Sequence, residues 1–230
     1  MKKPTRNTSD LGFTLIEVTL AILIFGILSS AVLTAFNALF LSSQVLDRNI
    51  TLTDMGHRCL NRMISDIASA QISLPPAYAI PQTSSIDFEK NADPFRIVGD
   101  GGASDFPQLR FASLAHLTID GNMRKGIARI VYYVEENEDQ SFSIKRADDL
   151  EPWPPFEENR NDPVLCENVI SLEFGYHGQT DEIQTAWDSE SGEYGYATPQ
   201  AISIKIELGD AQKKQTLKTT AILPSYRGKK

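Results

Sequence analysis

The sequence has 230 residues, a formal net charge of −8 and 41% hydrophobic residues. This length suits one domain of ordinary size with an N-terminal anchor, and a mean hydropathy of −0.23 argues against a protein made mostly of membrane spans. Nucleic-acid binding is disfavoured, because neutralising phosphates needs clustered Lys and Arg side chains that this acidic sequence does not show.

A basic leader, residues 1–12, precedes a long apolar segment. Its charged residues give a net of +2: Lys2, Lys3, Arg6 and Asp10. From Val18 to Phe36 no residue is charged, and 19 helical residues reach about 28 Å, close to the ~30 Å hydrocarbon core of a bilayer. Positive residues flanking a span stay in the cytoplasm, so the rest of the chain is expected to be exported.

Glu17 lies at the start of this span. A secretory signal peptide is the alternative for residues 1–36, but its apolar core should be shorter and end at a small-residue cleavage site. Neither a signal peptide nor a plain anchor needs this acid, since a carboxylate at the membrane centre costs about 2.5–3.5 kcal/mol and less near the edge. We therefore expect Glu17 to have a positive partner in the membrane. The alternative is a solvated interfacial carboxylate without a function.

The helix is expected to continue from Phe13 to about Ile72, with Pro75-Pro76 as its stop. Gly26 and Gly56 should each weaken it by about 1 kcal/mol relative to Ala. In the second half, apolar residues recur at helical spacing: Leu52, Met55, Cys59, Leu60, Met63, Ile64 and Ile67. Polar residues take the other side: Asp54, His57, Arg58, Asn61, Arg62 and Ser65. This pattern predicts an amphipathic helix on a globular core.

After Pro81, short β-rich runs alternate with turn residues, which predicts an antiparallel sheet and, with the helix, an α+β fold. The candidate strands are Ser85–Phe88, Arg96–Val98, Gln108–Phe111, Ile127–Glu135, Phe142–Arg146, Val169–Tyr176, Ala201–Leu208 and Thr216–Leu223. Strict alternation from Ile202 to Leu208 predicts one buried and one solvated face. Ile127–Glu135 and Phe142–Arg146 flank an acidic turn and should form a hairpin.

Three long polar connections are predicted: Gly99–Asp105, Asp148–Asp162 and Gly178–Tyr196. Loops of this length on a rigid sheet are either binding surfaces or solvated excursions. The basic end of the chain, Arg227–Lys230, is expected to fray.

The sequence shows no motif for catalysis, for a metal or for a cofactor. The histidines, His57, His116 and His177, have no nucleophile motif around them and are expected to be surface or turn residues. The acidic loops Glu135–Asp139 and Glu157–Asp162 lack the ligand spacing of an EF-hand, and no Gly-rich phosphate loop opens a helix. We therefore expect a protein that is not an enzyme.

Cys59 and Cys166 are the two cysteines. They are too far apart for zinc-ligand spacing. Export would let them oxidise if the fold brought them together, closing a loop of about 107 residues worth at most about 4.7 kcal/mol. Contact is geometrically feasible, because Cys59 lies on the apolar helix face and Cys166 just before a predicted strand. Two separate buried thiols are the alternative.

The segment Gly12–Glu17, with the sequence GFTLIE, resembles the cleavage and methylation motif of type IV pilin-like proteins. The resemblance implies that a prepilin peptidase cuts between Gly12 and Phe13 and methylates the new amine of Phe13. It also implies that Glu17 is the assembly acid of the family. Physical chemistry agrees, because Glu17 of one subunit pairing with the Phe13 amine of its neighbour would turn two costly membrane charges into one contact.

The chain then divides into a cleaved leader, a transmembrane half-helix, an amphipathic half-helix, a β-rich periplasmic head and a basic tail: 1–12, 13–41, 42–72, 73–226 and 227–230. The head resembles that of the J-type minor pseudopilin of type II secretion in its Ile127–Arg146 hairpin, the strand Val169–Tyr176, the Trp187 loop and the run from Pro199.

That resemblance implies I-type and K-type minor pseudopilins as partners. Together they would form a tip complex, anchored in the bacterial inner membrane, that primes a periplasmic pseudopilus for protein export. The K-type subunit, which lies at the top of the tip complex, typically lacks the helix acid. The presence of Glu17 therefore indicates that this subunit lies just below the topmost position of the tip. The alternatives are a minor pilin of a type IV pilus or competence system, and a membrane-tethered periplasmic binding module or enzyme with the long loops as its site.

Overall fold

The computed structural model describes residues 14–81, 93–101, 106–117, 125–210 and 213–229, without the side chains of 38–39 and 41–50. The chain forms two compact units, Met1–Ile50 and Thr51–Lys230. Helix α1, Leu15–Ala68, contributes to both. It ends four residues before the predicted limit, and the predicted strand Ser85–Phe88 lies outside the described residues.

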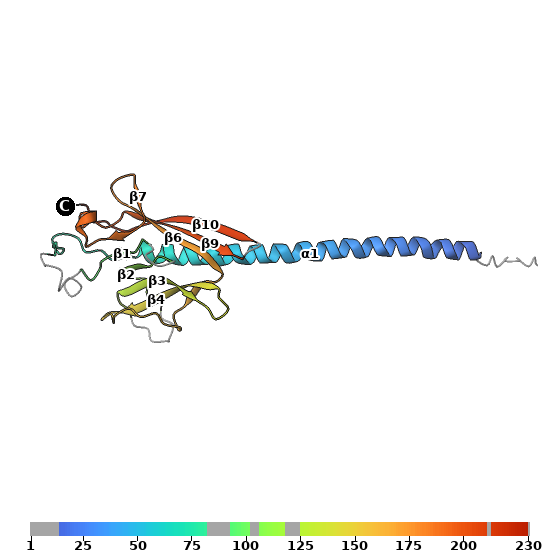
Figure 1. Cartoon of the computed structure of the whole chain (residues 1–230), viewed down its shortest axis with the longest axis horizontal. Helices are drawn as coiled ribbons and strands as arrows, with labels where there is room; N and C mark the ends of the chain where they lie inside the picture. Colours follow the sequence, from blue (N-terminus) through green and yellow to red (C-terminus); the bar gives the residue numbers. More distant parts are fainter. Residues whose placement is uncertain (1–13, 82–92, 102–105, 118–124, 211–212, 230) are drawn as a thin grey trace, which may run out of the picture. The chain divides into compact units, whose positions relative to one another are not determined.

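The second unit contains two antiparallel sheets, which confirms the predicted α+β class with two sheets in place of one (Figure 1). The six-stranded sheet has the order β5-β4-β3-β2-β1-β8. Its strands are β1 Val98–Gly99, β2 Leu109–Ser113, β3 Ala128–Glu136, β4 Phe142–Leu150, β5 Val164–Cys166 and β8 Trp187–Asp188. The four-stranded sheet has the order β10-β9-β6-β7. Its strands are β6 Val169–His177, β7 Ile183–Gln184, β9 Ala201–Gly209 and β10 Lys214–Ile222.

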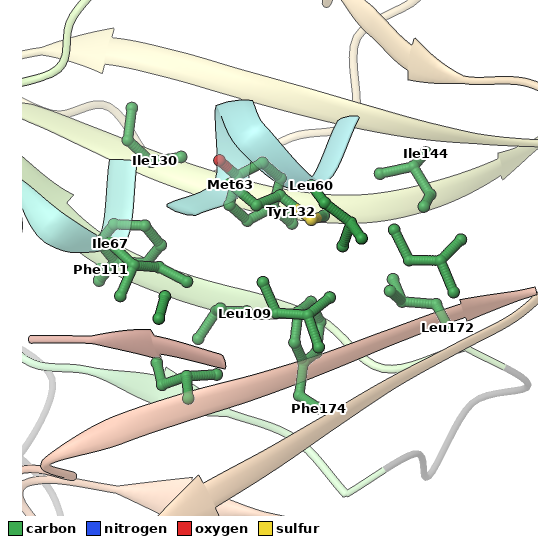
Figure 2. Close-up of a cluster of buried hydrophobic side chains, with 14 of the residues drawn as sticks. Leu60, Met63, Ile67, Leu109, Phe111, Ile130, Tyr132, Ile144, Leu172 and Phe174 are labelled. Carbon is green, nitrogen blue, oxygen red and sulfur yellow. The ribbon is translucent and has the colours of Figure 1, made fainter. Parts of the chain in front are cut away.

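The last turns of α1 lie between the two sheets, and the apolar stripe predicted from the sequence fills the space between them (Figure 2). Leu60, Met63 and Ile67 are at most 4% exposed. They pack in one core with side chains of both sheets: Leu109, Phe111, Ile130, Tyr132, Ile144, Leu172 and Phe174. Burial of this stripe on two sides explains why α1 remains helical beyond its apolar half.

Two predicted sheet features are confirmed. Strand β9 buries Ile202, Ile204, Ile206 and Leu208 to 1% exposure or less, as predicted, although Ser203 on the face expected to be solvated is also buried, at 8% exposure. Strands β3 and β4 form the predicted hairpin, although β4 extends four residues further and its register runs from Ala128 opposite Leu150 to Glu136 opposite Phe142.

Gly56 lies where β10 packs on α1. A Cβ at this position would come within 2.7 Å of Leu217 Cδ1. The glycine therefore permits a close approach of helix and sheet, which offsets its poor helix propensity.

The predicted connection Gly178–Tyr196 is more structured than expected. It contains β7, β8 and the 3₁₀-helix η1, Gly192–Tyr194, and Trp187 is 3% exposed with Nε1 donating to Ala197 O at 2.9 Å. The connection therefore completes both sheets, since β8 pairs with β1 and β7 with β6.

The expected fraying of the basic end is wrong for Arg227, which is 2% exposed. Its guanidinium donates to the carbonyl oxygens of Tyr196, Ser73 and Ser189 at 2.7, 3.1 and 2.7 Å. It also pairs with Asp93 and Glu190 at 3.0 and 2.9 Å and stacks 3.3 Å over the Tyr78 ring. Lys229 is exposed.

Candidate assembly site

The first part of α1 has the composition of a membrane span. Leu15–Asn37 covers 23 residues with a mean hydropathy of 2.3, and none of this segment is buried within the chain. Large apolar side chains point outward along it, among them Leu15, Ile22, Phe25, Leu33 and Phe36. A helix that is apolar all round and uncovered by its own chain is suited to lipid.

Glu17 and Thr14 form a capping box at the start of this segment. The Thr14 amide donates to Glu17 Oε2 at 2.9 Å, and the Thr14 hydroxyl donates to the same oxygen at 2.8 Å. In return, the Glu17 amide donates to Thr14 Oγ1 at 3.4 Å. The pair satisfies donors that a helix N-terminus leaves without intrahelical partners.

The capping box shows how the chain itself holds the Glu17 carboxylate. Among the described residues, both hydrogen bonds to the Glu17 carboxylate go to Oε2. Sequence reasoning did not identify Thr14, although the spacing Thr14-x-x-Glu17 is a capping-box signature. Gly12 and Phe13, the predicted cleavage and methylation residues, lie outside the described residues.

A buried ion cluster ties α1 to the six-stranded sheet within the second unit. Asp66 of α1 and Arg146 of β4 both have fully buried side chains, and Arg146 Nε donates to Asp66 Oδ2 at 2.7 Å. The Tyr132 hydroxyl of β3 and the Arg62 guanidinium also donate to Asp66. Burial, followed by the neighbouring Asp66 charge, raises the pKa of Tyr132 well above its usual value, so Tyr132 remains a donor.

The cluster extends to Asp148, which accepts hydrogen bonds from Arg146, from the Leu117 amide at 2.8 Å and from His116 across 2.6 Å. Burial alone would raise the pKa of Asp148, but these bonds outweigh burial and lower it. His116 is therefore a largely buried member of this cluster, which corrects the expectation of a surface or turn histidine. The sequence pattern did not reveal the cluster.

The connection Asp148–Asp162 folds back on the outer face of the six-stranded sheet. Phe156 packs edge-on against Tyr133 with ring centroids 5.5 Å apart, and the Trp153 Nε1 donates to Ile127 O at 3.3 Å. A surface pocket of about 760 Å³ lies beside it, lined in part by Arg96 and Arg129. Asp188 and Asp149 pair with these arginines, so their charge is largely compensated.

Cys59 and Cys166 meet in the core as free thiols, each 1% exposed. They belong to the same cluster of buried side chains, and Cys166 together with burial raises the pKa of the Cys59 thiol. Within the described ranges, no group of three or more His, Cys, Asp or Glu side chains is arranged to hold a metal ion.

Comparison with known protein families identifies this arrangement. The family model for type II secretion system (T2SS) protein J matches residues 36–219, well over half of the chain. The chain belongs to the type II secretion system protein J family. No curated protein matches it. The prokaryotic N-terminal methylation motif matches residues 8–33, a range that includes Gly12, Phe13 and Glu17.

Membership confirms the predicted function of a minor pseudopilin in type II secretion. Proteins of this family work in the pseudopilus with other pseudopilins and carry the methylation motif of prepilin peptidase substrates. The protein J match covers most of the β-rich head, the part that distinguishes this subunit from a pilus or competence pilin with a similar N-terminus. The apolar segment Leu15–Asn37 fits a membrane-anchored pseudopilin.

Proposed function

We propose that this protein J is a structural subunit of the pseudopilus tip complex, anchored in the inner membrane with its head in the periplasm. Its partners are the I-type and K-type minor pseudopilins, and the complex primes pseudopilus assembly for protein export. Prepilin peptidase cleaves after Gly12 and methylates Phe13. The observation that carries the proposal is an acidic residue, Glu17, at the start of a 23-residue apolar span in a protein J chain.

Glu17 is the residue that pairs one subunit with its neighbour during assembly. The capping box occupies Oε2 with two Thr14 donors, which holds the carboxylate at a defined place on the helix. The amine of Phe13 on a neighbouring subunit supplies the cation that a carboxylate near lipid requires. A subunit that has this acid needs such a neighbour, which supports a position just below the summit of the tip.

Replacing the acid tests this role. We expect Glu17→Leu to be cleaved and inserted normally, but to enter the pseudopilus at least about tenfold less, which corresponds to about 1.4 kcal/mol of lost pairing. The measurement is the fraction of the variant that co-sediments with sheared pseudopili, compared with its total in the membrane. Val18→Leu adds the same side chain at the next exposed position and should assemble normally. Normal incorporation of Glu17→Leu would refute the pairing.

The proposed partners are tested with the full-length chain in detergent. A tagged chain should co-purify with co-expressed I-type and K-type candidates in a stable complex that size-exclusion chromatography resolves from the free subunits. An unrelated single-span protein with the same tag is the control for detergent-mediated association. If neither candidate is retained above that control, the tip complex is the wrong assignment for this protein J.

A further inference from the structure

We propose that Cys59 and Cys166 form an intramolecular disulfide that fastens α1 to the edge strand β5. This inference rests on the proposed export of the head, because an oxidising compartment is needed for the bond to persist. The chain has two cysteines, and the fold brings both to one point of the core from positions 107 residues apart.

The geometry places Cys166 against the turn of α1 that carries Cys59. Cys166 Sγ lies 4.0 Å from the carbonyl oxygen of Met55, the residue one helical turn before Cys59 on α1. Cys166 also pairs opposite Ile144 of β4, which fixes it on the side of the sheet that faces the core. Cys59 belongs to the same cluster of buried side chains as Cys166.

The folded environment determines when the bond can form. Cys166 and then burial raise the pKa of the Cys59 thiol far above its usual value, so the closed core holds no reactive thiolate. Oxidation therefore takes place during folding, while both thiols are still accessible. A thiolate of one cysteine attacks the disulfide of a protein thiol–disulfide oxidant, and the second thiolate displaces that oxidant from the mixed disulfide. Two protons leave the cysteines, and their two electrons reduce the oxidant to a dithiol.

The bond would act on an edge strand of the six-stranded sheet. Strand β5 has three residues, pairs with β4 alone and shows a register shift between Ile144 and Lys145. Short, irregular edge strands open easily. A covalent link from Cys166 to the rigid helix would keep this edge closed.

The test counts free thiols in the full-length protein. Cells that express the secretion system are quenched with acid, and the denatured chain is treated with a polyethylene-glycol maleimide before or after reduction. We expect no label before reduction and two labels after it, with a monomer on non-reducing gels. Two labels before reduction, or a disulfide-linked dimer, would overturn the proposal. Cys59→Ser should carry one label under both conditions.

A second arm separates the disulfide from the export on which it rests. The purified reduced chain is unfolded and refolded in detergent with glutathione and glutathione disulfide. The intramolecular bond should form, and reduction should then lower the unfolding midpoint by roughly 5–10 °C, with no such shift in the double variant Cys59→Ala, Cys166→Ala. Failure to form the bond in this arm overturns the pairing and leaves export untouched. A bond that forms here, with free thiols in the cell, overturns its occurrence in the cell and contradicts the exported location.

Discussion

Asp66→Ala is expected to lower the free energy of unfolding of the head by about 3 kcal/mol. The substitution leaves the Arg146 guanidinium fully buried without its principal partner, and it removes the acceptor of the buried Tyr132 hydroxyl. Breaking a buried pair from one side costs about 3–5 kcal/mol. We expect the lower end, because Asp148 still contacts Arg146. Denaturation of the full-length chain in detergent, followed by tryptophan fluorescence, measures the change.

Asp54→Ala is the matched control on the same helix. Asp54 pairs with Arg58 at the same four-residue spacing, but the two side chains are 52% and 76% exposed. Solvent screens an exposed pair of this kind, so Asp54→Ala should change the free energy of unfolding far less than Asp66→Ala. In a double-mutant cycle, Asp66→Ala and Arg146→Ala should also be strongly non-additive, since they remove one shared contact. Equal costs for Asp66→Ala and Asp54→Ala would show that the cluster does not hold α1 to the sheet.

The parts of this fold that could be predicted are those with a repeating pattern. The stripe from Leu52 to Ile67 and the alternation in β9 appear in the sequence as periodic apolar residues, and both pack in the core. The β3–β4 hairpin appears as two β-rich runs that flank an acidic turn. The assembly motif was equally visible, because Gly12–Glu17 is contiguous and its acid is anomalous in an apolar run. These signals need only local spacing.

Features that depend on distant partners could not be predicted. Asp66 and Arg146 are 80 positions apart, and each considered alone would be expected to face water, as charged residues usually do. Arg227 looks like part of a solvated tail until Asp93 and Glu190 are placed around it. Strands β7 and β8 have two residues each, too few for any periodicity. The missed elements are therefore those that tertiary pairing alone creates.

Arg227→Ala is expected to lower the free energy of unfolding by about 3–5 kcal/mol, as much as the loss of one partner of a buried ion pair. This is a large effect for a residue that lies three positions before the last residue of the sequence. The side chains of Asp93 and Glu190 are 5% and 0% exposed and would lose their cation. Three backbone carbonyls would also lose a donor. Arg227→Lys should fall in between, because an ammonium cannot reproduce the planar five-donor fork. The same fluorescence-detected denaturation measures each variant.

The pH dependence distinguishes lost pairing from lost packing at this end of the chain. Burial already raises the pKa of Glu190 even with Arg227 present, and removal of the cation would raise it further. A carboxyl with a raised pKa in the folded state destabilises that state as pH rises above its unfolded value of about 4.3. The deficit of Arg227→Ala should therefore be largest at pH 7 and shrink as pH falls toward about 4.5. Lys229→Ala, at an exposed position, should show neither effect. A deficit of constant size across this range would mean that Arg227 acts through packing on Tyr78 and not through charge.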